Sequence, residues 1–337
     1  MDALPLGKLK LGHLQKLLHR YTSTGDRVLL GPKVGEDAAV IDFGETCLVA
    51  KTDPITFVAE DIGWYTIVVN ANDIATRGAV PKWFLATLLL PENRTTAEMV
   101  DTIFAQLSGA CSRYQIAFCG GHTEVTYGID RPIVIGQMLG EVTKDNLITT
   151  AGAQVGDDIL LTKGIAIEGT SIIAQVKREK LLMKYGPEWL ERCRQFIYTP
   201  GISIIEDALA AVQFGQVHAM HDPTEGGLAT GLHELAEAAM VGVYVEYEAI
   251  PMFPETEQLC QEYHLDPLGT IASGALVLTA SPQETPGIIT GLKRKGIQAS
   301  VIGQIVPAKE GRILKKSMTT IPLPIYEQDE ITRIFGA

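Results

Sequence analysis

The chain contains 337 residues, of which 46% are hydrophobic, and its formal net charge is −12. This length exceeds what one hydrophobic core usually fills, so we expect two globular domains. The acidic balance argues against binding to nucleic acid or to an anionic membrane surface, because both require a cationic protein surface. The N-terminal segment is basic and amphipathic without a long apolar run, so we expect no signal peptide, no membrane span and a cytoplasmic location.

The first half of the chain mixes helical and strand patterns. Helices are expected from about Leu9 to Arg20, from about Gly63 to Arg77, and over 95–114. Short apolar runs predict strands over 38–43, 46–53, 83–91, 116–121 and 131–142. These elements predict an α+β domain of residues 1–150.

A turn-rich segment at 151–158 precedes a second set of elements, which predicts a C-terminal domain of residues 151–337. Strands are expected over 158–164, 216–220, 241–247, 274–280 and 299–306. Helices are expected near 169–177, 202–212, 228–240 and 284–295.

One predicted helix carries a narrow polar stripe through an otherwise apolar sequence. Its members are Thr66, Asn70, Asp73 and Arg77, at spacings of four, three and four residues. A buried aspartate is costly unless a cation or hydrogen-bond donors accompany it. The simplest interpretation pairs Asp73 with Arg77, and the alternative is a functional site.

Two further aspartates favour the functional interpretation. Asp37 lies at the entrance to one predicted strand, and Asp53 lies at the exit of the next, before a tight turn expected at Pro54. Each alone is typical of a turn residue. Because Mg²⁺ prefers carboxylate and phosphate oxygens, the set of Asp37, Asp53 and Asp73 predicts a magnesium and nucleotide site.

The segment CGGHTEVT forms a second cluster. Gly120 and Gly121 are expected to bring the backbone close to a ligand after a strand, presenting His122 and Glu124. His122 could act as a ligand, an acid or base, or a donor to phosphate. The alternative is a glycine turn with solvated polar side chains.

The segment HDPTEGGLATGLHELAEAA forms a third cluster. Asp222 or Thr224 is expected to cap a helix that begins near Gly226 and Gly227, and the helix N-terminus favours a phosphate or another anion. An ordinary N-cap is the alternative. A similar segment in which a loop leads into a helix, TKGIAIEGTS, provides Lys163, Gly169 and Thr170 as candidate ligand contacts.

The sequence contains no P-loop, dinucleotide-binding, zinc-protease or serine-hydrolase motif. Seven segments in order instead resemble the aminoimidazole ribonucleotide synthetase, or PurM-like, superfamily, which includes the hydrogenase maturation factor HypE, thiamine monophosphate kinase and selenophosphate synthetase. They are VGEDAAVI, KTDPITF, VNANDIATRGAVP, CGGHTEVT, the strand with LTKG, DPTEGGLATGLHELAEAAMVGV and LDPLGTIASGALV.

The resemblance implies a ferredoxin-like N-terminal domain, a C-terminal α/β domain, and a homodimer whose N-terminal sheets close into a β-barrel. It implies ATP and Mg²⁺ as cofactors, with Asp37, Asp53 and Asp73 as metal ligands. By motif, Thr52 and Asn70 lie beside these ligands, and Asp222 falls in a second-domain motif of the family. From the residue patterns above, we expect the remaining contacts to nucleotide or cofactor at Gly120, Gly121, Lys163, Gly226 and Gly227, and catalytic roles for His122, Glu124 and Asp222.

The chain resembles HypE most, but it departs from HypE at positions tied to chemistry. His122 stands where Asp is usual, Glu124 where HypE has Lys, and Ser273 near the position of a family Glu. The sequence ends Ile334-Phe335-Gly336-Ala337 without the HypE terminal Cys, so we expect the usual acceptor thiol to be missing.

Three functions remain open. The first is a HypE-like, ATP-dependent ligase, kinase or dehydratase that activates a carbonyl or phosphate acceptor of an unidentified small molecule through a phosphorylated intermediate. The second is thiamine monophosphate kinase, although DPTEGG replaces that family's Asp-Ile-Ser-Asp-Gly motif. The third is a non-catalytic nucleotide-binding partner in maturation.

Overall fold

The computed structural model describes residues 4, 9, 11–33, 35–56 and 60–335. Its contacts divide these residues into two compact units. The N-terminal unit comprises Thr24–Gly31 and Asp37–Leu147, and the C-terminal unit comprises the described parts of Met1–Ser23, Pro32–Glu36 and Ile148–Ala337. The segment before residue 24 thus clusters with the C-terminal unit, and the division into domains 1–150 and 151–337 stays a prediction.

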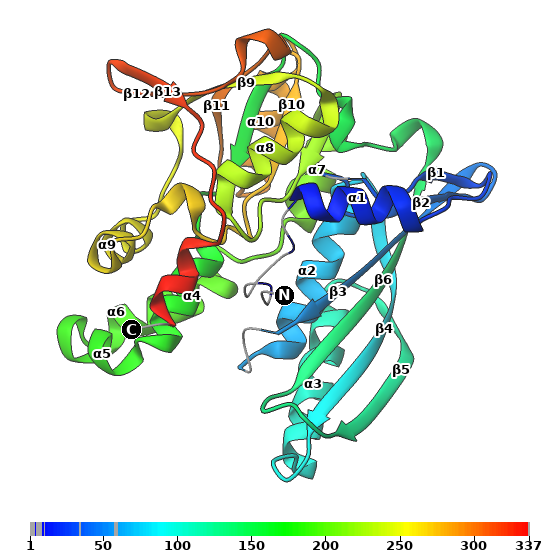
Figure 1. The fold of residues 1–337 in the computed structure, drawn as a ribbon, viewed down its shortest axis with the longest axis vertical. Helices are drawn as coiled ribbons and strands as arrows, with labels where there is room; N and C mark the ends of the chain where they lie inside the picture. Colours follow the sequence, from blue (N-terminus) through cyan, green and yellow to red (C-terminus); the bar gives the residue numbers. More distant parts are fainter. Residues whose placement is uncertain (1–3, 5–8, 10, 34, 57–59, 336–337) are drawn as a thin grey trace. The chain divides into compact units, whose positions relative to one another are not determined.

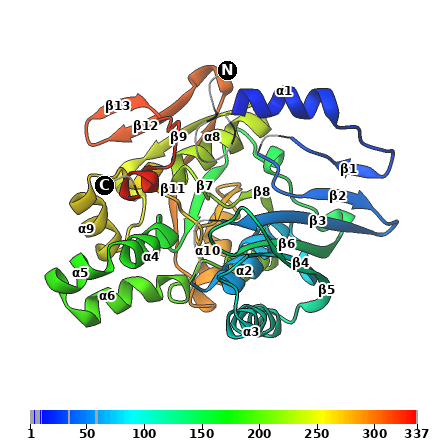
Figure 2. The same ribbon diagram turned by 60° about the horizontal axis from the view of Figure 1, so that its bottom comes forward.

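The N-terminal unit is built on a six-stranded mixed sheet in the order β1-β2-β3-β6-β4-β5 (Figure 1). Its elements are β1 (Val28–Leu30), β2 (Ala39–Asp42), β3 (Thr46–Ile55), α2 (Ile62–Ala75), β4 (Val80–Pro91), α3 (Ala97–Arg113), β5 (Ala117–Thr126), β6 (Ile133–Thr143) and η1 (Lys144–Asn146). Only β4 and β5 pair in parallel, and α3 connects them. Figure 2 shows α2 and α3 on the same side of the sheet.

The predicted α+β class is confirmed, but the order of elements in this unit differs from the expected ferredoxin-like arrangement. A ferredoxin-like domain runs β-α-β-β-α-β. Here the order from β3 to β6 is β-α-β-α-β-β, and β6 lies between β3 and β4. The last strand, β6, therefore lies next to β3 in the sheet, and α2 packs against both of these strands.

The C-terminal unit contains a seven-stranded sheet in the order β13-β12-β9-β11-β7-β10-β8. Its strands are β7 (Asp158–Thr162), β8 (Val217–His221), β9 (Gly242–Glu246), β10 (Val277–Ala280), β11 (Ala299–Val306), β12 (Arg312–Lys316) and β13 (Thr319–Pro322). Its helices are α1 (Leu11–Tyr21), α4 (Ile167–Val176), α5 (Arg178–Tyr185), α6 (Pro187–Arg194), α7 (Ile205–Phe214), α8 (Gly227–Ala239), α9 (Pro254–Tyr263) and α10 (Thr285–Arg294). Short 3₁₀ turns are η2 (Thr150–Gly152), η3 (Gln195–Ile197), η4 (Tyr247–Ala249), η5 (Pro267–Gly269), η6 (Ala308–Glu310) and η7 (Glu330–Ile334).

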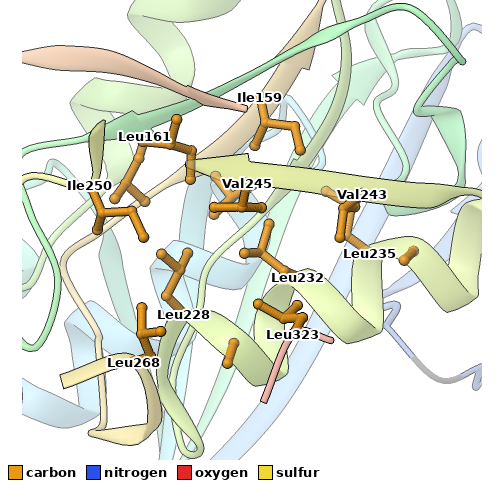
Figure 3. Packing of buried hydrophobic residues seen from close by; sticks show 14 of the residues in the cluster. Ile159, Leu161, Leu228, Leu232, Leu235, Val243, Val245, Ile250, Leu268 and Leu323 are labelled. Carbon is orange, nitrogen blue, oxygen red and sulfur yellow. The ribbon is translucent and has the colours of Figure 1, made fainter. Parts of the chain in front are cut away.

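The core of the C-terminal unit lies between α8 and the sheet (Figure 3). Leu228, Leu232 and Leu235 recur along one face of α8 and meet Ile159 of β7 and Val245 of β9. Burying such side chains contributes roughly 1.5–3 kcal/mol each. This packing fixes the start of α8, which was one of the predicted anion sites.

Most predicted elements are present, with three differences. Helices α5, α6 and α9, strand β1, and the hairpin of β12 and β13 were not predicted. Strand β3 continues through Pro54 to Ile55, so the tight turn expected there was wrong. Strand β5 continues to Thr126, so Gly120 and Gly121 lie inside a strand and not in a turn after it. Within the described residues, none of the helices combines the length and the apolar character that crossing a bilayer requires.

Candidate functional site

The polar stripe of α2 lies inside the N-terminal unit. The side chains of Thr66, Asn70, Asp73 and Arg77 are all buried, and Arg77 follows directly after the helix C-cap. The amide nitrogen of Asn70 donates to the carbonyl oxygen of Thr66 at 2.9 Å and to that of Asp53 on β3 at 3.3 Å. The stripe is therefore the surface through which α2 contacts β3.

A lysine that was not predicted lies at the centre of the aspartate set. Nζ of Lys51 is 2.9 Å from Oδ2 of Asp73 and 3.5 Å from Oδ2 of Asp53. Lys51 and Asp53 are two residues apart on β3, so their side chains point to the same face of the sheet. The ion-pair partner of Asp73 here is therefore Lys51, and not the Arg77 of the simplest sequence interpretation.

Asp37 belongs to the same unit and forms the second ion pair of the cluster. Its Oδ2 accepts a hydrogen bond from Nη2 of Arg77 at 3.2 Å, and the Arg77 side chain is fully buried. As predicted, Asp37 lies just before a strand, because β2 begins at Ala39. The three aspartates thus come from three segments: the approach to β2, the end of β3, and α2.

The protonation behaviour of these groups reflects their closeness. Burial raises the pKa of Asp73 to about 6, and the carboxylates of Asp37 and Asp53 add to this shift. The ammonium of Lys51 opposes it by favouring the charged carboxylate. Burial alone would lower the pKa of Lys51, but the surrounding carboxylates raise it above its ordinary value.

Two features fit this cluster to a cation. Its oxygen donors are three carboxylates, which Mg²⁺ prefers. In addition, Oδ1 of Asn70 is fully buried and has no hydrogen-bond partner among the described residues. Such an acceptor is costly to leave without a partner, and a ligand would satisfy it. Thr52, the other predicted neighbour, donates from its hydroxyl to the carbonyl oxygen of Gly136 at 2.9 Å.

Glycines on β6 let α2 approach the sheet closely. A Cβ at Gly136 would collide with the Asn70 amide, and a Cβ at Gly140 would collide with Ile74 and lie 2.7 Å from the carbonyl oxygen of Val80. Sequence reasoning did not single out this pair. Their spacing of four residues places both on the same face of β6 and could have indicated a close helix contact.

The residues of CGGHTEVT are exposed on β5, an edge strand of the sheet. Nε2 of His122 lies 3.1 Å from Oε2 of Glu124, and both side chains are about half exposed or more. Gly121 has a φ of +149°, and a Cβ there would collide with the carbonyl oxygen of Ala86 on β4. Gly121 is therefore explained by strand packing, and the ligand-binding roles predicted for Gly120, Gly121, His122 and Glu124 stay predictions.

Asp222 lies directly after β8 and is buried in the C-terminal unit. Its neighbour His221 is also buried, and Nε2 of His221 lies 2.9 Å from Oε2 of Glu234 on α8. The helix begins later than the prediction that placed Asp222 or Thr224 at its N-cap position, so that placement was wrong. The N-cap is Gly226, whose φ of +85° is in the left-handed region that favours glycine.

The carboxyl group of Asp329, a residue of the chain itself, binds at the start of α8. Oδ2 of Asp329 accepts a hydrogen bond from the backbone N–H of Gly226 at 2.6 Å, and its Oδ1 accepts from Ile271 at 3.2 Å and from Ile331 at 2.8 Å. The backbone N–H at the helix N-cap thus has a carboxyl oxygen of the chain itself as its partner. A ligand anion predicted at Gly226 and Gly227 would have to replace Asp329.

The LTKG segment is also engaged in internal contacts. Nζ of Lys163 donates to the carbonyl oxygen of Ser203 at 2.6 Å and lies 3.3 Å from Oδ1 of Asp207. Burial lowers the pKa of Lys163, and Asp207 opposes the shift. Thr170, likewise offered as a ligand contact, lies buried in α4 and hydrogen-bonds Thr256 at 2.7 Å. The nucleotide-binding role of Lys163 stays a prediction.

The structure thus brings together Asp37, Asp53 and Asp73, with Asn70 and Thr52 beside them. Lys51 and Asp329 were missed. Lys51 had a signal, because it continues the row of inward-facing residues Cys47 and Val49 on β3. Asp329 had none, since its partner Gly226 is 103 positions away.

Two protein-family models match the chain. The model of the AIR synthase related protein, N-terminal domain, matches residues 35–142, and that of the AIR synthase related protein, C-terminal domain, matches residues 154–316. Both matches are compatible with the two units of the structure, and together they extend over most of the chain.

Curated relatives include hydrogenase maturation proteins. A putative hydrogenase expression/formation protein of Methanocaldococcus jannaschii is 28% identical over 287 residues, which are 83% of this chain and 82% of that protein. Carbamoyl dehydratase HypE of Cupriavidus necator is 29% identical over 263 residues, which are 77% of this chain and 71% of that protein.

Solved structures share the fold. The hydrogenase maturation protein HypE in complex with ATP superposes with a TM-score of 0.71 at 21% identity, over 94% of this chain and 91% of HypE. Thiamine monophosphate kinase from Aquifex aeolicus superposes with a TM-score of 0.67 at 19% identity, over 93% of this chain and 98% of the kinase.

Proposed function

The chain belongs to the AIR synthase related protein family, and from this premise we propose that it is an ATP- and Mg²⁺-dependent enzyme. In the proposed reaction, an oxygen of a small-molecule carbonyl or phosphate acceptor attacks the terminal phosphorus of ATP. The bond from that phosphorus to the bridging oxygen breaks, ADP leaves, and the acceptor becomes a phosphorylated intermediate. The fold, the two family matches and the resemblance drawn from the seven sequence segments agree on this superfamily.

The observation that carries the proposal is the convergence of Asp37, Asp53 and Asp73 on one partly buried, lysine-containing cluster. These carboxylates would hold the magnesium ion, with Asn70 and Thr52 beside them. When bound, Mg²⁺ would neutralise phosphate charge and polarise the transferred phosphoryl group. Arg77 fixes the position of Asp37, because its guanidinium is fully buried and directed at that carboxylate.

The known activities of related proteins support ATP as the nucleotide. HypE has been solved in complex with ATP, and HypE of Cupriavidus necator is a carbamoyl dehydratase. The identity of the substrate is a separate question. We propose Asp222, His122 and Glu124 as acid or base groups for it, and Gly120, Gly121, Lys163, Gly226 and Gly227 as contacts to the ligand.

The turnover test uses a mixture of candidate acceptors. Magnesium-dependent ADP formation is measured with pooled small carboxylates, carbamoyl compounds and phosphate monoesters, including thiamine monophosphate. We expect Asp53→Asn and Asp73→Asn to lower the rate by about 100-fold or more, because each removes a charged ligand from a desolvated site. Asp101→Asn, an exposed change on α3, serves as the matched control. Unchanged turnover in both site variants would refute the assignment, and turnover with thiamine monophosphate alone would identify the kinase.

We further propose a homodimer formed through the N-terminal sheets. One face of that sheet is covered by α2 and α3, whereas the opposite face carries half-exposed apolar side chains, among them Leu85, Leu89, Ile135 and Leu139. Apolar surface of this kind is typical of an interface. Light scattering should give about twice the monomer mass of 36.5 kDa, and Leu89→Glu should give the monomer. A wild-type monomer at micromolar concentration would contradict this proposal.

A further inference from the structure

Lys51 holds an unusual place for a cation. It lies on the helix-facing side of β3, in the row that includes Cys47 and Val49, and its side chain is 19% exposed. A lysine in such a row is costly to bury unless anions neutralise it. Here Asp73 and Asp53 do so, at 2.9 and 3.5 Å.

The ammonium of Lys51 therefore uses the same carboxylate oxygens that would ligate a metal ion. Counted with the Asp37–Arg77 pair, the cluster contains three carboxylates and two cationic side chains, and its net formal charge is −1. A divalent cation is attracted much less by this cluster than by three carboxylates alone. A metal bound through Oδ2 of Asp73 would also have to displace Lys51 from a 2.9 Å contact.

Displacing Lys51 is costly unless another anion receives it. A buried cation that loses its partner suffers an uncompensated desolvation penalty. The phosphates of a nucleotide would supply that anion, and they would also supply metal ligands. Oδ1 of Asn70 is buried and has no hydrogen-bond partner in the described part of the chain, and the amide nitrogen of Asn70 lies 3.3 Å from the carbonyl oxygen of Asp53. This acceptor independently indicates a ligand beside the cluster.

We infer that Lys51 is a built-in counter-ion that makes the binding of the divalent cation conditional on the nucleotide. This inference rests on the proposed function, because it concerns the same site. In the apo protein, Lys51 neutralises Asp73 and Asp53. When nucleotide and metal arrive together, the ammonium transfers its contact to a phosphate oxygen and the carboxylates turn to the metal. A free divalent cation, without nucleotide, binds weakly.

The test titrates the full-length protein with Mn²⁺ alone and measures free Mn²⁺ by its electron paramagnetic resonance signal. We expect Lys51→Met to bind Mn²⁺ at least about tenfold more tightly than the wild type, because the cation is removed while the side-chain volume is kept. Lys51→Arg should remain weak like the wild type. Lys82→Met, which removes an exposed lysine paired with Glu141 on the same sheet, is the matched control and should change nothing.

Two further measurements test the role of Lys51 in binding the divalent cation. If Lys51→Met is poorly folded, Mn²⁺ alone should raise its melting temperature but not that of the wild type, and the added variant Asp53→Asn should abolish this rescue. Equal Mn²⁺ affinity in wild type and Lys51→Met, or no gain in either assay, would overturn the role of Lys51. A parallel titration with Mn²⁺ and ATP separates the two claims: if no variant binds ATP, the proposed function fails, whereas the comparison with Mn²⁺ alone still decides the role of Lys51.

Discussion

Asp329 shows how one side chain can occupy a site that sequence patterns assign to a ligand. Its carboxylate accepts three backbone hydrogen bonds, including one from Gly226 at the start of α8. Burial nevertheless raises the pKa of Asp329 to about 6, although the three donors oppose the shift. The neutral form is therefore favoured in the folded protein relative to the unfolded chain.

This shift predicts a pH-dependent contribution to stability. Since the folded pKa lies above the ordinary value of 3.8, the contribution of Asp329 is fully present below about pH 4 and is lost as the pH rises through about 6. In the Asp329→Asn variant, the side chain does not titrate, and one of the two acceptor oxygens is replaced by an amide nitrogen. Its free energy of unfolding should therefore fall below that of the wild type by an amount that shrinks between about pH 4 and pH 7.

Urea unfolding of both proteins across this pH range measures that difference. Glu310→Gln, an exposed change in the same unit, should leave the unfolding free energy unchanged at each pH. A difference between wild type and Asp329→Asn that grows with pH would show that hydrogen bonding to the carboxylate outweighs burial, and the assigned direction of the pKa shift would be wrong.

At the scale of elements, the contact of α2 with β6 decides whether the aspartate cluster forms. Gly140 lies where a Cβ would meet Ile74 and the backbone oxygen of Val80. Because Val80 contributes backbone to this contact, a rotamer change cannot relieve the collision. The position of α2, and with it that of Asp73, therefore depends on the absence of a side chain at Gly140.

Gly140→Ala should accordingly reduce the free energy of unfolding by roughly 1–3 kcal/mol, as other overpacking changes do. Gly109→Ala on α3 is the matched control, because nothing lies within 4 Å of its added Cβ. This control should be neutral or stabilising by up to about 1 kcal/mol, since alanine favours a helix over glycine. Chemical denaturation measures the free energy of unfolding of both variants. Equal changes in the two variants would show that α2 does not require its close contact with β6 at Gly140.

The elements that sequence patterns predicted well have a strong periodic signal. The α2 helix is mostly apolar apart from one stripe, and Asn70 and Asp73 of that stripe contact β3. Helices α6 and α9 were missed, although Pro187 and Pro254 stand in their first turns, a position that favours proline. Their mixed polar sequences weakened the periodicity on which the prediction relied.

Other errors arose from contacts between distant segments. Pro54 was expected to end β3, but β3 pairs with β6 beyond that point. The neighbouring β2 pairs only with Cys47–Ala50, so Pro54 lies where β3 has no partner on that side and where a missing N–H costs little. Gly121 was expected to follow a strand and approach a ligand, because its close approach to Ala86 cannot be inferred from local sequence.

At the scale of the whole molecule, both units contain ion pairs that neutralise buried charges. The N-terminal unit pairs Lys51 with Asp73 and Arg77 with Asp37, and the C-terminal unit pairs Lys163 with Asp207. The predicted metal residues all lie in the N-terminal unit. The central claim, that this unit binds nucleotide through magnesium, can therefore be tested separately from the identity of the substrate.

Isothermal titration calorimetry of the full-length protein with a non-hydrolysable ATP analogue tests this claim most directly. We predict saturable binding that requires Mg²⁺, and a loss of about tenfold or more in affinity in Asp73→Asn but not in Asp101→Asn. Saturable binding that does not change when Mg²⁺ is chelated, or equal affinity in Asp73→Asn and the wild type, would contradict the assignment of the cluster as the magnesium and nucleotide site.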